Sequence, residues 1–78
     1  MTAISTFDFN ANGIDRLFFA DLYIYLKKYT ELPANSADEY IEALITEGGA
    51  LSIKHESSVF AGPIIAACWD ILEKYKLP

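Results

Sequence analysis

The sequence predicts an all-α fold, a three-helix bundle with an extended N-terminal arm. Apolar residues recur at helical spacing in three segments, and Pro33 and the Glu56-Ser57-Ser58 run separate those segments by short connections. The 78 residues are 53% hydrophobic and 22% charged, which fits one domain over residues 1–78. A chain of this size buries only about 60% of the surface that its unfolded form exposes, so its core must be dense.

The N-terminal arm covers residues 1–11 and is too short for periodicity to decide its structure. Its apolar residues are Ile4, Phe7 and Phe9, which are separated by polar ones. The turn that follows contains Asn12, which we expect to be the N-cap of the first helix because asparagine favours caps and turns.

The first helix is expected over about residues 14–30. Asp15 would then lie in its first turn, where a carboxylate favours the positive end of the helix dipole. Pro33 ends the helix, because it biases Leu32 away from helical geometry. The predicted core face consists of Ile14, Leu17, Phe18, Leu22, Tyr25, Leu26 and Tyr29.

The second helix is expected over about residues 37–55. It starts at a capping box, in which the Ser36 hydroxyl and the Glu39 carboxylate each satisfy a free backbone N–H. Gly48 and Gly49 are unfavourable inside a helix, so either they let another helix approach closely or the helix breaks there; we favour the first. The predicted core face consists of Ile41, Leu44, Ile45, Gly48, Leu51 and Ser52.

The third helix is expected over about residues 59–76. Ser57 or Ser58 can cap it, and Pro63 is tolerated in its first turn, where a missing N–H is not needed. The predicted core face consists of Phe60, Ile64, Ala67, Cys68, Ile71, Leu72 and Tyr75.

Residues 22–76 carry four features that resemble a known group of proteins. These are a lysine pair closing an aromatic helix, an acidic-aromatic helix start, a Leu-Ser-x-Lys segment and a final helical run. In sequence order they are Tyr25 with Lys27-Lys28-Tyr29, Asp38-Glu39-Tyr40, Leu51-Ser52-Ile53-Lys54 and Ala67-Cys68-Trp69-Asp70-Ile71-Leu72-Glu73-Lys74.

With these features the chain resembles small, uncharacterised helical proteins encoded by phages and prophages of Gram-positive bacteria. It departs from their pattern in its N-terminal arm and at Gly48-Gly49. The resemblance implies an all-helical fold and an origin in a mobile genetic element, and it carries over no catalytic residue.

The net charge and the cysteine content of the chain exclude several classes of function. The net charge of −5 argues against direct binding to nucleic acid, which needs a basic surface. The single Cys68 excludes an internal disulfide and fits a reducing compartment. The N-terminus shows no secretory signal, and no apolar run reaches the roughly 20 residues that span a bilayer. We therefore expect a cytoplasmic protein that binds no membrane, cofactor or metal.

Two side chains are candidates for catalysis, and both have simpler interpretations. His55, the single histidine, is a possible general base, but at a helix C-terminus it favours the dipole and the last carbonyls. Cys68 is a possible nucleophile, but its apolar neighbours predict a small buried hydrophobic residue.

An acidic patch is expected where the first helix ends and the second begins. Its members are Glu31, Asp38, Glu39 and Glu42. The patch either meets a basic partner or is a solvated, dipole-favourable helix N-terminus, and we favour the second interpretation.

The chain has more apolar side chains than the three predicted core faces account for. Those outside the predicted core are Phe19, Tyr23, Ile24, Ile53, Ile65 and Trp69. Two i, i+4 pairs, Phe19 with Tyr23 and Ile65 with Trp69, predict two surface patches. We expect the arm, with Ile4, Phe7 and Phe9, to cover one patch and a protein partner to cover the other, with Trp69 at or beside that interface.

The sequence therefore predicts a small acidic, non-enzymatic protein-interaction module, self-associating as a homodimer and derived from a phage. The alternative within binding functions is an acidic inhibitor that blocks a basic, nucleic-acid-handling site on a host protein. An enzyme ranks third, because no pair of titratable residues has recognisable catalytic spacing.

Overall fold

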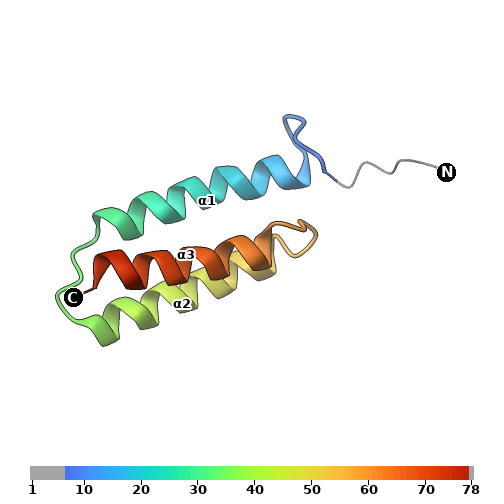
Figure 1. Ribbon diagram of the computed structural model, residues 1–78. Helices are drawn as coiled ribbons and strands as arrows, with labels where there is room; N and C mark the ends of the chain where they lie inside the picture. Colours follow the sequence, from blue (N-terminus) through green and yellow to red (C-terminus); the bar gives the residue numbers. More distant parts are fainter. Residues whose placement is uncertain (1–6, 78) are drawn as a thin grey trace.

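The computed structural model describes residues 7–77 and shows a three-helix bundle (Figure 1). The helices are α1 (Ile14–Glu31), α2 (Ala37–Lys54) and α3 (Ala61–Lys76). Short loops make α2 antiparallel to both α1 and α3, and the described part of the arm, residues 7–11, lies at the same end of the bundle as the α2–α3 loop (Figure 1). The all-α prediction is confirmed, and the helix bounds agree with the expected ones to within two residues.

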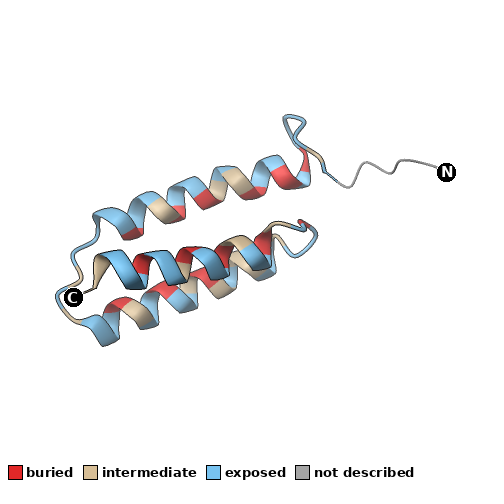
Figure 2. Ribbon diagram, in the orientation of Figure 1, coloured by how far each residue is buried: buried red, intermediate tan, exposed pale blue. Residues whose placement is uncertain are grey.

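Each helix turns one stripe of residues toward the bundle axis (Figure 2). The stripes repeat at intervals of three or four residues, as one face of a 3.6-residue helix requires. The buried apolar core consists of Phe18, Leu22, Tyr25, Tyr29, Tyr40, Leu44, Ala61, Ile65, Cys68 and Leu72.

The predicted core face of α3 is wrong, because the buried stripe is rotated about the helix axis by roughly one residue from the expected one. Ile65, which was expected on the surface, is 1% exposed, whereas Ile71 and Tyr75 lie mostly in solvent. Both faces of this helix are apolar, so periodicity alone does not separate them. The indole N–H of Trp69 donates to the Tyr25 hydroxyl (3.0 Å), and this bond turns the Ile65 side of α3 inward.

Smaller corrections apply to α1 and α2. Ile14 and Leu17 of α1 and Ile45 of α2 were expected in the core but are exposed, and Tyr40 is buried instead. Tyr40 enters the core because its hydroxyl donates to the Tyr29 carbonyl at 2.6 Å. Capping the polar end of the ring in this way makes burial of the aromatic body favourable.

Gly48 provides a close approach between helices, as expected, and α2 continues through Gly49 without a break. A Cβ atom on Gly48 would lie 2.6 Å from both the Trp69 Nε1 atom and the Tyr25 hydroxyl oxygen. A Cβ atom on Gly49 would meet nothing within 4 Å. The first glycine is therefore required by packing, and the second is not.

The start of α1 is capped by the arm rather than by Asn12, so that prediction is wrong. The N-cap is Gly13, which has no side chain to offer, and the Asp8 carbonyl accepts the N–H groups of Asp15 and Arg16 (both 3.1 Å). A Cβ atom on Gly13 would overlap Asp8, which explains the glycine at this position.

Asp15 joins three segments at this end of the bundle. Its side chain is fully buried (0% exposed), and its carboxylate accepts the Asp8 N–H (2.6 Å) and the Ser58 hydroxyl (2.7 Å). Ser58 lies in the α2–α3 loop and also accepts the Phe60 N–H at 3.2 Å. The sequence predicted Asp15 only as a dipole partner in the first turn of the helix, whereas the structure also makes it the link between the arm, α1 and that loop.

The start of α2 agrees with its sequence signal, whereas α3 begins two residues later than expected and its N-cap, Phe60, makes no side-chain cap bond, so the serine cap predicted for α3 is wrong. The Ser36 hydroxyl accepts the Glu39 N–H at 3.4 Å, which is the serine half of the capping box. Pro63 lies in the first turn of α3, where its missing N–H leaves no helical bond unmade.

We expect the two neighbouring glycines of α2 to respond to alanine in opposite directions. Gly48→Ala should lower the free energy of unfolding, because overpacking costs about 1–3 kcal/mol and the gain in helix propensity is at most about 1 kcal/mol. Gly49→Ala should raise it by up to about 1 kcal/mol. Urea unfolding followed by circular dichroism measures both; equal effects would contradict the close approach at Gly48.

Removing the Asp15 carboxylate should destabilise the fold. Asp15→Ala leaves the Asp8 N–H and the Ser58 hydroxyl without an acceptor, which costs about 1–3 kcal/mol. Asp70→Ala, at an exposed position of α3, is the matched control and should stay within about 0.5 kcal/mol of wild type. Similar stabilities for the two variants in thermal unfolding would refute the linking role of Asp15.

Candidate interaction surface

Of the two predicted apolar patches, only the one at Phe19 and Tyr23 is present on the surface. Phe19 is half-buried, packed edge-on against Phe60 at a ring-centroid distance of 5.1 Å, while Tyr23 remains exposed. The Ile65–Trp69 patch does not exist, because Ile65 lies in the core and Trp69 packs against the core with its indole N–H bonded. The expected position of Trp69 at a solvent-facing patch is therefore wrong.

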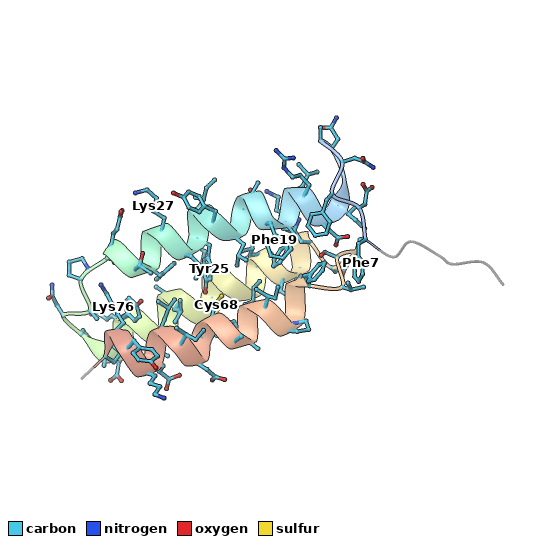
Figure 3. All side chains as sticks on the ribbon, turned by 45° about the horizontal axis from the view of Figure 1, so that its top comes forward. Phe7, Phe19, Tyr25, Lys27, Cys68 and Lys76 are labelled. Carbon is cyan, nitrogen blue, oxygen red and sulfur yellow. The ribbon has the colours of Figure 1, made fainter. Side chains whose placement is uncertain are left out.

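The arm covers only half of the patch that it was expected to cover, because Phe9 packs on Phe19 while Tyr23 remains exposed. The Phe9 ring lies 5.8 Å from the ring of Phe19 and 5.8 Å from that of Phe60. The Phe7 ring lies 5.3 Å from that of Phe60, and Figure 3 shows Phe7 and Phe19 at the same end of the bundle. Phe7 and Phe9 each remain about half exposed, and Ile4 lies outside the described residues.

The predicted acidic patch is exposed but partly neutralised. The Lys27 ammonium pairs with Glu31 at 2.7 Å. Asp38, Glu39 and Glu42 lie exposed at the start of α2, where negative charge favours the helix dipole.

The two catalytic candidates do not form a reactive pair. The His55 Nε2 atom lies 2.7 Å from an Asp21 carboxylate oxygen, and its ring packs edge-on against Phe18. Cys68 is buried in α3, and burial raises the pKa of its thiol, so the protonated form is favoured. His55 thus joins α2 to α1 through Asp21, instead of binding the last carbonyls of its own helix.

A groove between α1 and α2 is the surface feature that sequence reasoning missed. It encloses about 270 Å³. Its lining residues are Asp21, Ile24, Tyr25, Glu47, Ala50, Leu51 and Lys54. The one signal in the sequence was Ile24, which lay outside the predicted core face; the structure leaves it 65% exposed at the groove.

The floor of the groove is held in place by Tyr25, which points inward from α1 (Figure 3). Its hydroxyl donates to the Leu44 carbonyl at 2.6 Å and accepts the Trp69 indole N–H. Burial raises the pKa of Tyr25 to about 12, so the hydroxyl stays protonated at neutral pH and keeps its role as donor. The groove therefore offers a fixed apolar floor rather than a titrating group.

Ion pairs between α1 and α2 flank the apolar centre of the groove. At one end Asp21 pairs with Lys54 at 2.9 Å, and at the other Glu47 pairs with Lys28 at 2.8 Å. Hydrogen bonding to Lys54 and then to His55 lowers the pKa of Asp21. The bond from Lys28 is the largest effect on Glu47 and lowers the pKa of its carboxyl, helped by the Tyr29 hydroxyl (2.8 Å). Both carboxylates are therefore charged at neutral pH.

Comparisons with family models, curated proteins and solved structures find no match for this chain. The resemblance of residues 22–76 to phage and prophage proteins therefore stays a prediction.

Within residues 7–77, no three histidine, cysteine or carboxylate side chains come together as a metal site would need. Over the same residues, no helix combines the length and apolar character required to cross a membrane.

The Asp21 cluster should stabilise the fold in a pH-dependent way. A carboxyl with a lowered pKa stabilises the folded state above its unfolded pKa of about 3.9 and stops doing so as pH falls through the folded value. Asp21→Asn should therefore cost a few tenths to about 1 kcal/mol at pH 7, the range of partly exposed ion pairs. The difference from wild type should vanish near pH 2, and urea unfolding at both pH values measures it. A difference that is the same at both would show that the charge of Asp21 is irrelevant.

Proposed function

We propose that the protein is a small, non-enzymatic interaction module that associates with a second copy of itself. The observation that carries the proposal is apolar surface left over after the core has closed. Among the described residues every buried side-chain polar atom has a hydrogen-bond partner. Yet Ile24 and Ile53 are 65% and 72% exposed, and Tyr23 and Tyr75 also lie mostly in solvent. Exposed apolar and aromatic side chains are typical of protein interfaces.

The two catalytic candidates support a binding function over an enzyme. His55 is held by Asp21, and Cys68 is a buried thiol with a raised pKa. Cys68 lacks the exposed, electropositive surroundings that a nucleophile requires, and the His55 side chain is only 9% exposed, with its Nε2 atom occupied by Asp21. The free cysteine also fits the reducing cytoplasm that we propose as its location.

The acidic-inhibitor alternative has less support. Its patch loses Glu31 to the Lys27 ion pair, and Asp38 and Glu39 occupy the helix start that their charge stabilises. Ionic strength separates the two functions, because a charge-driven complex with a basic partner weakens steeply with salt, whereas an apolar contact does not.

Sedimentation equilibrium tests the proposal on the wild-type chain. The average molar mass in solution should rise with loading concentration from 8.7 kDa, the mass of one chain, toward twice that value. This rise should persist in high salt. Concentrations from about 1 µM to about 1 mM cover the range expected for a weak dimer. A mass of 8.7 kDa throughout that range would refute self-association.

A further inference from the structure

The charges along the α1–α2 groove are arranged so that the groove of one copy is complementary in charge to the groove of a second copy. Asp21 and Lys28 lie seven residues apart on α1, and Glu47 and Lys54 lie seven residues apart on α2. Because the two helices are antiparallel, each negative group lies across the groove from a positive group of the other helix. We propose that a second copy of this chain docks face to face on this groove, which deepens and rests on the proposed self-association.

Two-fold symmetry brings opposite charges together in this arrangement. If the axis runs along the helices, α1 faces α2 of the other copy, so Asp21 meets the partner's Lys54. The partner's Glu47 then lies opposite Lys28 at the other end. An axis across the helices instead sets Asp21 against the partner's Lys28. Neither arrangement opposes like charges, so the surface suits the isologous contact of a symmetric dimer.

The four groups keep bonding capacity for a partner despite their pairs within the chain. Their side chains remain partly to mostly exposed, Asp21 least and Lys54 most. A lysine ammonium has three donors and a carboxylate about four acceptor sites, so one ion pair saturates neither. A second copy therefore extends each pair into a network of four charges without breaking the pairs already formed.

The shape of the groove favours the axis along the helices. Ile24 protrudes midway between the two α1 charges, and Ala50 lies midway between the two α2 charges. With α1 against α2, the protruding Ile24 of each copy lies over the small Ala50 of the other. With α1 against α1, the two Ile24 side chains would meet and leave the hollows at Ala50 unfilled.

The size of this surface predicts a weak, reversible dimer. Two 18-residue helices side by side present a face about 27 Å long and about 20 Å wide. The dimer then buries about 1,000 Å² in total, which is the lower limit for a specific interface. Dilution should therefore separate the copies.

A matched pair of isoleucine variants tests the position of the interface. Ile24→Ser removes the protruding side chain from both copies and should weaken dimerisation more than ten-fold. Ile53→Ser changes an even more exposed isoleucine of α2 that does not line the groove, and it should leave dimerisation unchanged. Sedimentation equilibrium measures both, with circular dichroism confirming that each variant is folded.

A pair of charge variants tests the complementarity. Lys28→Glu with Lys54→Glu makes the groove uniformly acidic, and Asp21→Lys with Glu47→Lys makes it uniformly basic. At low salt each double variant alone should be monomeric and a 1:1 mixture should form a heterodimer, whose affinity should fall with salt more steeply than that of wild type. If circular dichroism shows that either fails to fold, the isoleucine pair decides.

The outcomes separate this inference from the proposed function. If wild type dimerises and Ile24→Ser dimerises equally well, or if the folded charge variants do not associate on mixing, the groove is not the interface and self-association stands. If wild type is monomeric at every concentration, self-association itself is refuted.

Discussion

The hydroxyl of Tyr25 is the contact on which the arrangement of the three helices depends. It donates to the Leu44 carbonyl of α2 and accepts the Trp69 indole N–H of α3, so one side chain of α1 binds both other helices near the middle of the bundle. The junction needs Gly48, since a side chain there would occupy the space of both aromatic groups. It sets the rotation of α3 and, by fixing the Tyr25 ring, provides the floor of the α1–α2 groove.

A second polar junction closes the end of the bundle where the arm lies. The backbone of Asp8 and the side chain of Asp15 bond reciprocally, because the Asp8 carbonyl caps α1 while the Asp15 carboxylate holds the Asp8 N–H. Ser58 adds the α2–α3 loop to the same carboxylate. With the arm so anchored, Phe9 lies against Phe19, and the aromatic surface at this end is partly covered by the chain itself.

The groove combines a rigid apolar floor with charged ends, and each has a different physical role. In the proposed dimer the apolar centre would supply the driving force for association, because removing exposed Ile24 from water is favourable. The ion pairs at Lys28 and Lys54 add little net energy at a partly solvated rim, but they penalise wrong registers by opposing like charges. In a small interface the burial of apolar surface usually supplies the affinity, and the arrangement of charges supplies the specificity.

The sequence by itself determined the three helices, the cap at Ser36, the burial of Cys68 and the close approach at Gly48. Each follows from local chemistry, such as helical periodicity or capping. It did not determine which apolar face of α3 turns inward, the burial of Asp15 or the α1–α2 groove. Those depend on bonds between residues 7 to 44 positions apart, as between Asp15 and Ser58 or Tyr25 and Trp69. Local patterns do not encode these pairings; only packing of the three helices against one another brings the partners within hydrogen-bond distance.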